Sequence, residues 1–345
     1  MSVRKKDGGK PIRCLLHDSN ARTIVAHNSN DWKSTDMIVF EKLEDIRNIE
    51  PTVVALGNFD GIHRGHQEII GRSVKEAEAA GLKSAVFTFS NHTSSILKDV
   101  PQVKNILYPE EKMQILENMG VDYVFNIPFT EEILRMSPED FIEQILVKRF
   151  NIREAYCGFN YSFGYKASGT PEILMHEGLR HGFGIHVQEP FMIDGVVVSS
   201  TYIRQLIEEG RMEECTKLMG RMYAISGEIV VGNRLGRTIG FPTCNTLVDN
   251  TMITPPNGVY ITTCTIDGIT RPSVTNVGVK PTIGTYEKNI ETHIFDFNED
   301  VYGKKIRVDF IRHTRGEKKF DGLDALKNQI ESDCITARVY HRQNR

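Results

Sequence analysis

Residues 57–66 read GNFDGIHRGH and directly follow the apolar run PTVVAL at residues 51–56. A short apolar run bounded by turn residues is typical of a buried β-strand. Gly57 and Gly61 allow the backbone to turn sharply and to approach a ligand closely. A helix is expected from about His63 to Ala80. This succession of strand, tight turn and helix is typical of α/β folds.

The same alternation continues to about residue 218. Further strands are expected at 84–89, 121–127, 154–157 and 186–189, and further helices at 110–119 and from residue 138. Ser137, Pro138 and Asp140 form the signature of a helix start, with Ser137 as the N-cap. Strands separated by helices pair in parallel through right-handed crossovers, which predicts a doubly wound sheet. Ligands bind beyond the carboxyl ends of such strands, where GNFDGIHRGH lies.

The pattern changes near Tyr223 to short β-rich runs that predict a second, all-β domain. These runs are ISGEIVVG, GVYITTCTI, ITRPSV, ETHIFDF and KKIRVDFIR. Asp267 and Gly268 form a two-residue hairpin signal between two of them. A final helix is expected at 323–341. The predicted organisation is a polar amino-terminal extension at 1–36, a first domain at 37–219 and a second at 220–345.

Length and composition limit the class of protein. A chain of 345 residues is long enough for two cores, and its 40% hydrophobic and 25% charged content is that of a globular protein. The net charge of −3 provides no broad basic field for nucleic acid. No apolar segment is long enough to span a membrane, and the amino terminus lacks a signal-peptide core. Six cysteines without CxxC spacing fit a cytoplasmic location. The oligomeric state and the role of residues 1–36 stay open.

GNFDGIHRGH has the composition of a phosphate site. His63 and His66 are three residues apart and so share one face of the helix start. The unpaired N–H groups and partial positive charge of a helix start attract phosphate, to which both imidazoles can donate. Such an arrangement suits a reaction in which negative charge builds on phosphorus. The alternatives are surface histidines beside a glycine turn, or a metal site, for which the neighbouring sequence offers no third ligand.

A second polar helix start occurs in VVSSTYIRQLIEEG, residues 197–210. Ser200 and Thr201 lie at the expected helix start, and Arg204 follows one turn later. Taken alone, the hydroxyls indicate an N-cap. Together with the two histidines they favour a triphosphate site, in which Arg204 clamps phosphate oxygens.

GNRLGRTIGFPTCNT, residues 232–246, has a similar composition in the second domain. Gly236 allows close approach to a phosphate, and Arg237 adds positive charge. Thr243 and Asn245 are two apart, so in an extended segment both oxygens face the same way and suit Mg²⁺. The alternative is a loop with a Pro-Thr turn.

Glu291 is expected to begin the strand ETHIFDF. It is either a solvated surface residue or a general base that accepts a proton from an attacking hydroxyl.

The first two motifs together resemble a known family. GxFDxxHxGH followed by SSTxxR is similar to the nucleotidylyltransferase superfamily, and GNFDGIHRGHQ with VSSTYIRQLIEEG resembles its flavin branch, the bacterial bifunctional riboflavin kinase/FAD synthetases. The resemblance implies a Rossmann-like domain in which FMN attacks the α-phosphorus of ATP, forming FAD and releasing pyrophosphate. It implies that the ATP phosphates are surrounded by Asn58, Phe59, Asp60, His63 and His66, with Ser200, Thr201 and Arg204 closing over them.

The second half resembles the riboflavin kinase domain of the same family, a small β-barrel followed by a helix. GRTIGFPTCN, GVY, TNVGVKPT, ETHIFDF, YGKKIRVDFI and RGEKKF occur in that order. The resemblance implies that Thr243 and Asn245 hold Mg²⁺ and ATP phosphate. It makes Glu291 the base that activates the riboflavin 5′-hydroxyl for attack on the γ-phosphate. Asn276 and Arg315 complete the implied binding set, with Arg315 near the flavin.

Two segments depart from the family pattern. Residues 90–93 read SNHT where Pro-His-Pro is usual, and CGFNYSFG places Asn160 and Ser162 where the family has Asp and Arg. These segments lie near the FMN and adenine sites of the family. The departures motivate an alternative, a riboflavin kinase with a weakened or altered transferase domain. A further alternative is a non-catalytic flavin-binding regulatory protein.

Overall fold

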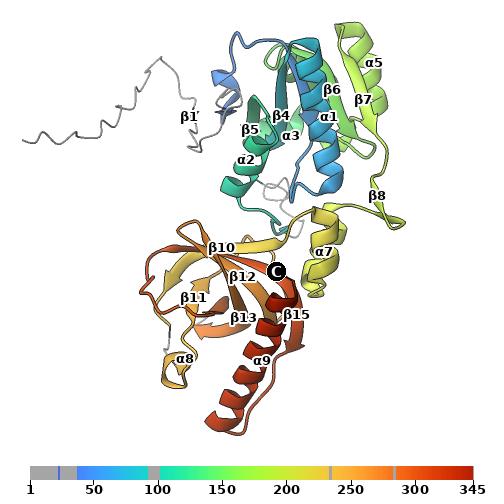
Figure 1. Ribbon diagram of the computed structural model, residues 1–345. Helices are drawn as coiled ribbons and strands as arrows, with labels where there is room; N and C mark the ends of the chain where they lie inside the picture. The colour runs from blue at the N-terminus through green and yellow to red at the C-terminus, as the bar shows by residue number, and fades with distance from the viewer. Residues whose placement is uncertain (1–21, 24–36, 92–101, 233–234, 283–284, 345) are drawn as a thin grey trace, which may run out of the picture.

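The computed structural model describes residues 22–23, 37–91, 102–232, 235–282 and 285–344. An α/β body and a β-barrel follow one another along the chain, and a long carboxyl-terminal helix lies along the barrel (Figure 1). Within the described residues, no helix combines the length and apolar character that crossing a membrane requires.

The first body is built on a sheet with strand order β1-β2-β5-β4-β3-β6-β7. Its strands are β1 (Arg22–Thr23), β2 (Ile38–Phe40), β3 (Thr52–Leu56), β4 (Lys83–Phe89), β5 (Tyr123–Ile127), β6 (Ile152–Gly158) and β7 (Gly184–Gln188). Strands β2 to β7 are parallel, and β1 pairs antiparallel with β2. Every residue of β3 is buried, as expected for a central parallel strand covered on both faces. The expected doubly wound sheet is confirmed.

Helices cover both faces of this sheet. They are η1 (Leu43–Asp45), α1 (Arg64–Ala80), α2 (Pro109–Asn118), α3 (Glu131–Arg135), α4 (Pro138–Asp140), the π-helical η3 (Phe141–Val147), η4 (Tyr165–Ala167) and α5 (Pro171–His181). Apolar residues of α1 pack on one face and those of η3 on the other. The Ser137 hydroxyl accepts a hydrogen bond from the Asp140 amide at 3.0 Å, which confirms the expected helix start.

The second body is a closed antiparallel barrel with strand order β10-β11-β14-β13-β12-β15. Its strands are β10 (Tyr223–Val230), β11 (Cys244–Leu247), β12 (Gly258–Ile266), β13 (Ile269–Thr282), β14 (Thr285–Ile294) and β15 (Lys305–Gly316). Asp267 and Gly268 both have positive φ and join β12 to β13, so the expected hairpin is confirmed. The expectation that Glu291 begins a strand is wrong. β14 begins at Thr285, because its polar first half still pairs with β13.

The short helix α8 (Leu235–Thr238) lies between β10 and β11 in the chain, and the long helix α9 (Leu323–Gln343) follows β15. Cys334 and Ala337 of α9 belong to a buried cluster with Val259, Ile261 and Val274 on the outer surface of the barrel. The end of the chain therefore covers one side of the barrel, as Figure 1 shows.

Between the two bodies lie the short hairpin β8 (Met192–Ile193) and β9 (Val196–Val197), then α6 (Ser200–Glu208) and α7 (Met212–Met219). Their apolar residues share one buried cluster with the barrel interior, in which Leu206 and Met212 accompany Tyr223 and Phe310. The helix pair thus packs on the barrel although it precedes residue 220. The expected domain boundary at that residue remains a prediction.

Candidate functional site

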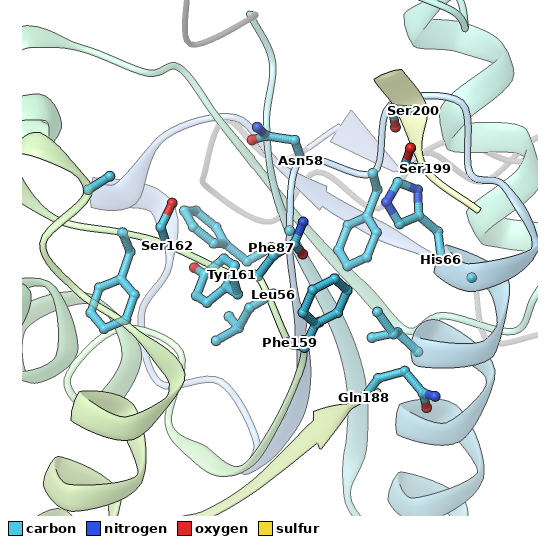
Figure 2. A pocket seen from close by; sticks show the side chains of 18 of the residues that line it. Leu56, Asn58, His66, Phe87, Phe159, Tyr161, Ser162, Gln188, Ser199 and Ser200 are labelled. Atoms are coloured by element: carbon cyan, nitrogen blue, oxygen red, sulfur yellow. The ribbon is translucent and has the colours of Figure 1, made fainter. Parts of the chain in front are cut away.

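A cavity of about 570 Å³ opens beyond the carboxyl ends of the parallel strands, where ligand binding was expected. One wall is the turn after β3, which contributes Gly57, Asn58 and Phe59. Another is the loop after β6, which contributes Asn160. Figure 2 shows His66, Ser199 and Ser200 at one end of this cavity and Tyr161 and Ser162 farther along it.

The turn after β3 has an unusual backbone. Phe59, Gly61 and Ile62 have φ values of 49°, 82° and 32°. Glycine adopts this left-handed region easily, whereas a β-branched isoleucine rarely does. The turn therefore depends on contacts from the rest of the molecule to keep its conformation.

His63 and His66 lie together at the start of α1. The Nδ1 atom of His63 accepts a hydrogen bond from the His66 amide at 3.2 Å, so His63 is the N-cap of the helix. The two imidazole rings are stacked with centroids 3.5 Å apart. Burial lowers the pKa of His63 to about 4 and holds the pKa of His66 well below its usual value. Both rings are neutral at pH 7, and the buried Nδ1 of His66 has no hydrogen-bond partner among the described residues.

The start of α6 is tied to the same turn. The Ser199 hydroxyl caps the helix by accepting a hydrogen bond from the Tyr202 amide at 3.2 Å. The Ser200 hydroxyl donates to the carbonyl of Asp60 at 2.8 Å. Ser200 and Thr201 both line the cavity. The structure thus brings these two predicted residues together with His63 and His66, which lie about 140 residues away in sequence.

Arg204 and Asp60 pair with each other through a salt bridge. The Arg204 guanidinium also donates to the Lys104 carbonyl at 2.8 Å, and Asp60 accepts from the Ile106 amide at 3.1 Å. Neither residue lines the cavity. In this arrangement they brace the turn after β3, and their expected phosphate contacts remain predictions.

Aromatic side chains form the other end of the cavity, and the residue-level predictions missed them. They are Phe87, Phe89, Phe129, Phe141, Phe159, Tyr161 and Phe163. The alternating aromatics in FTF at 87–89 and FNYSF at 159–163 were the available signal. Asn91, one of the departures from the family pattern, accepts a hydrogen bond from the Phe129 amide at 2.7 Å. It therefore holds the loop after β4 to the loop after β5 at this end.

Lys112 of α2 is a second residue that sequence reasoning missed. Its ammonium group donates to the Asn58 carbonyl at 2.8 Å and to the Thr88 hydroxyl at 2.5 Å. Burial lowers the pKa of Lys112 to about 8, and the charge of Asp60 opposes that shift. No sequence motif marks this lysine, because its role depends on contacts 24 and 54 residues away.

Four residues expected in the second site lie in one row across the barrel. In the strand register, Glu291 of β14 stands opposite Asn245 of β11 on one side and Asn276 of β13 on the other. Val259 of β12 stands opposite both Asn276 and Arg315. Paired residues of neighbouring strands point to the same face, so the row lies on the outer surface of the barrel.

Asn289 joins this row, and sequence reasoning missed it. Its side-chain amide donates to Asn245 at 3.2 Å and to Glu291 at 3.0 Å. It lies two residues before Glu291, so strand periodicity was a usable signal. The Asn289 Oδ1 atom is buried without a hydrogen-bond partner among the described residues. Together with Asn245 Oδ1 and the Glu291 carboxylate it forms an oxygen-rich set of the kind that Mg²⁺ prefers.

Backbone close to Asn245 is tightly packed. A Cβ atom at Gly232 would lie 2.4 Å from the Asn245 side-chain nitrogen, and one at Gly236 would lie 2.3 Å from the Phe241 carbonyl. Thr243 directly precedes β11 and is exposed only in part. The side chain of Arg237 lies outside the described part of the structure. In the described parts of the chain, no three His, Cys, Asp or Glu side chains cluster closely enough to hold a metal ion.

Arg315 is held by the carboxyl-terminal helix. Its guanidinium donates to both carboxylate oxygens of Asp333, at 3.0 and 2.6 Å. The Phe320 ring lies 6.0 Å from the guanidinium carbon. Arg315 thereby ties β15 to α9 at the end of the row, and its expected flavin contact remains a prediction.

Comparison with known proteins assigns each body to a family. The family model described as FAD synthetase matches residues 45–202, and the one described as riboflavin kinase matches residues 219–341. The chain is 37% identical to the bifunctional riboflavin kinase/FMN adenylyltransferase of Bacillus subtilis, over 82% of this chain and 90% of that protein. The chain belongs to the bifunctional riboflavin kinase/FMN adenylyltransferase family. The protein of that name from Escherichia coli strain K12 is 32% identical over 84% of this chain and 93% of its own length.

A solved structure shares the arrangement of both bodies. It is described as a macrolide-efflux protein from Streptococcus pneumoniae and is 31% identical, with a TM-score of 0.81 over 88% of this chain and 98% of that one. In this chain, the part that matches the FAD synthetase model contains most of the parallel sheet and the cavity. The riboflavin kinase match falls on the barrel with the row of polar residues and α9. The expected fold of both halves is confirmed.

Proposed function

We propose that this chain phosphorylates riboflavin to FMN in the barrel and adenylylates FMN to FAD in the α/β domain, with ATP as co-substrate in both steps. The observation that carries the proposal is the presence of two separate polar sites, each within the body that matches the corresponding family model. The substrates are small molecules, and we propose a cytoplasmic location with neither nucleic acid nor membrane as a partner.

In the adenylyl transfer, a phosphate oxygen of FMN attacks the α-phosphorus of ATP, and the bond from that phosphorus to the pyrophosphate oxygen breaks. No protein nucleophile and no proton transfer is needed, so positioning and charge stabilisation supply the acceleration. His63 and His66 lie at the start of α1, where helix amides and neutral imidazole N–H groups can donate to phosphate oxygens. The aromatic end of the cavity fits the isoalloxazine ring, which stacks on such side chains.

In the kinase step, the Glu291 carboxylate accepts the proton of the riboflavin 5′-hydroxyl. The hydroxyl oxygen bonds to the γ-phosphorus of ATP, and ADP leaves. General-base assistance of this kind contributes about 10²–10⁴-fold. Asn289 donates to Glu291 and so orients the carboxylate. Thr243 and Asn245 would hold Mg²⁺, which would neutralise phosphate charge.

The test is a time course with purified protein, riboflavin, ATP and Mg²⁺, in which riboflavin, FMN and FAD are separated chromatographically. FMN that rises and then passes into FAD is the expected result. FMN that accumulates without FAD would instead identify a kinase with a weakened transferase domain, as the departures at Asn91, Asn160 and Ser162 suggest. Flavin binding without ATP turnover would contradict both activities.

Two substitutions assign the sites. His66→Ala is expected to abolish FAD formation from FMN while riboflavin phosphorylation persists. Glu291→Gln is expected to abolish phosphorylation while FAD still forms from added FMN. His186→Ala on β7 is the matched control, because this exposed histidine lies outside the cavity. Loss of both activities in either variant would contradict the two-site assignment.

A further inference from the structure

Arg221 lies at the junction between the two bodies, two residues before β10 of the barrel. Its guanidinium donates to the carbonyls of Gly61 and Ile62, at 3.0 Å in the case of Ile62. These carbonyls belong to the turn after β3 in the other body, about 160 residues earlier in the chain. Arg221 belongs to the segment that matches the riboflavin kinase model, and it contacts the turn after β3 in the segment that matches the FAD synthetase model.

The two accepting carbonyls lie in the left-handed part of that turn, which is strained at Ile62 although not at glycine. Gly61 and Ile62 both have positive φ, and His63 follows directly. A backbone in this region keeps its conformation only where its surroundings hold it. The planar guanidinium suits this role because it presents paired donors in a fixed fork, here to two successive carbonyls. Gln67 adds a second tie, since its side-chain amide donates to Ile62 at 2.8 Å and to the Met219 carbonyl at 2.9 Å.

We propose that Arg221 is a positioning residue for the adenylyl transfer, so that the transferase site is completed by the kinase half of the same chain. Arg221 does not line the cavity and acts through the backbone that places His63 and His66. Burial lowers its pKa only to about 10, so the group stays charged at neutral pH. The inference rests on the proposed formation of FAD in the first domain.

The test compares Arg221→Met and Arg221→Lys with the full-length wild type, measuring both reactions on each preparation. Misplaced histidines weaken transition-state stabilisation more than substrate binding, which also involves the aromatic end of the cavity. For Arg221→Met we expect kcat for FAD formation to fall at least tenfold. The KM for FMN and the riboflavin kinase rate should each stay within twofold of wild type. Lysine keeps the charge but can reach fewer carbonyls, so Arg221→Lys should give an intermediate kcat.

Arg312→Met is the matched control. Arg312 of β15 pairs with Glu213 of α7 and lies over the Tyr340 ring of α9, and neither partner belongs to the turn after β3, so Arg312→Met should leave FAD formation unchanged. The inference is overturned if Arg221→Met keeps kcat for FAD within twofold, if Arg312→Met causes the same loss, or if Arg221→Lys matches wild type. It is also overturned if both reactions fall in parallel in the methionine and lysine variants. A wild type that makes no FAD would refute the proposed function itself, and the role of Arg221 with it.

Discussion

At the scale of single residues, His63 couples the candidate site to the stability of the fold. The side chain is 4% exposed and caps α1, and burial lowers its pKa to about 4 from an ordinary value of 6.5. Between these two pH values the unfolded chain binds a proton that the folded chain does not. The stability that the neutral His63 side chain contributes is therefore fully present above about pH 6.5 and is lost as the pH falls toward 4.

This linkage predicts that the free energy of unfolding falls by about 2 kcal/mol between pH 7 and pH 5, because His63 binds a proton in the unfolded chain and not in the folded one. Urea unfolding of the wild type and of His63→Gln at both pH values would measure it. The glutamine variant, which cannot titrate, should lose about 2 kcal/mol less than the wild type over that interval. Equal losses would show that the imidazole is not kept neutral by burial.

Local patterns could predict those site residues whose neighbours are close in sequence. The spacing of His63 and His66 follows directly from the helix period, and their rings are stacked in the structure. Thr243 precedes the first residue of β11, so the expected pairing of its oxygen with that of Asn245 remains a prediction. Asn289 could have been found in the same way. Lys112 and Arg221 could not, because each acts through backbone carbonyls that only the complete fold brings near. The salt bridge between Arg204 and Asp60 could not be predicted either, because only the fold brings these two residues together.

At the scale of elements, the segment after β10 packs so closely on β11 that Gly232 has no room for a side chain. A Cβ atom there would lie 2.4 Å from the Asn245 amide nitrogen. Gly232→Ala should therefore displace the Asn245 side chain without unfolding the barrel, since that side chain can rotate. We expect the riboflavin kinase kcat/KM to fall by roughly 10- to 100-fold. FAD formation from added FMN should stay unchanged.

Kinetic assays of both reactions on Gly232→Ala would check this expectation. Gly71→Ala in α1 is the control, because a Cβ atom there meets nothing within 4 Å. Unchanged phosphorylation in Gly232→Ala would mean that the position of Asn245 does not limit the kinase step.

Elements were predictable where the local pattern was complete. The strand at β3, the cap at Ser137 and the hairpin at Asp267 each carry a local signal. The helix α5 was missed although Thr170 and Pro171 mark its start. The partner of α6 and α7 was not predictable from sequence, because an amphipathic pattern identifies an apolar face and not the surface that covers it.

At the scale of the whole molecule, α6 and α7 link the two bodies by completing the core of the barrel. Ile203, Leu206, Ile207 and Met212 are fully buried in the cluster that contains Tyr223 of β10. Each such side chain contributes about 1.5–3 kcal/mol through burial. A barrel without these helices would expose the apolar surface that they cover.

We therefore predict that a fragment of residues 198–345 is more stable than one of residues 220–345. The shorter fragment should melt at least ~10 °C lower, since 1 kcal/mol shifts the melting temperature of a small domain by about 4–8 °C. Thermal unfolding followed by circular dichroism would compare them. Leu206→Asp in the longer fragment is the matched variant and should lower its melting temperature toward that of the shorter one. Equal melting temperatures would show that the helix pair covers the barrel without stabilising it, and that the boundary at residue 220 separates independent units.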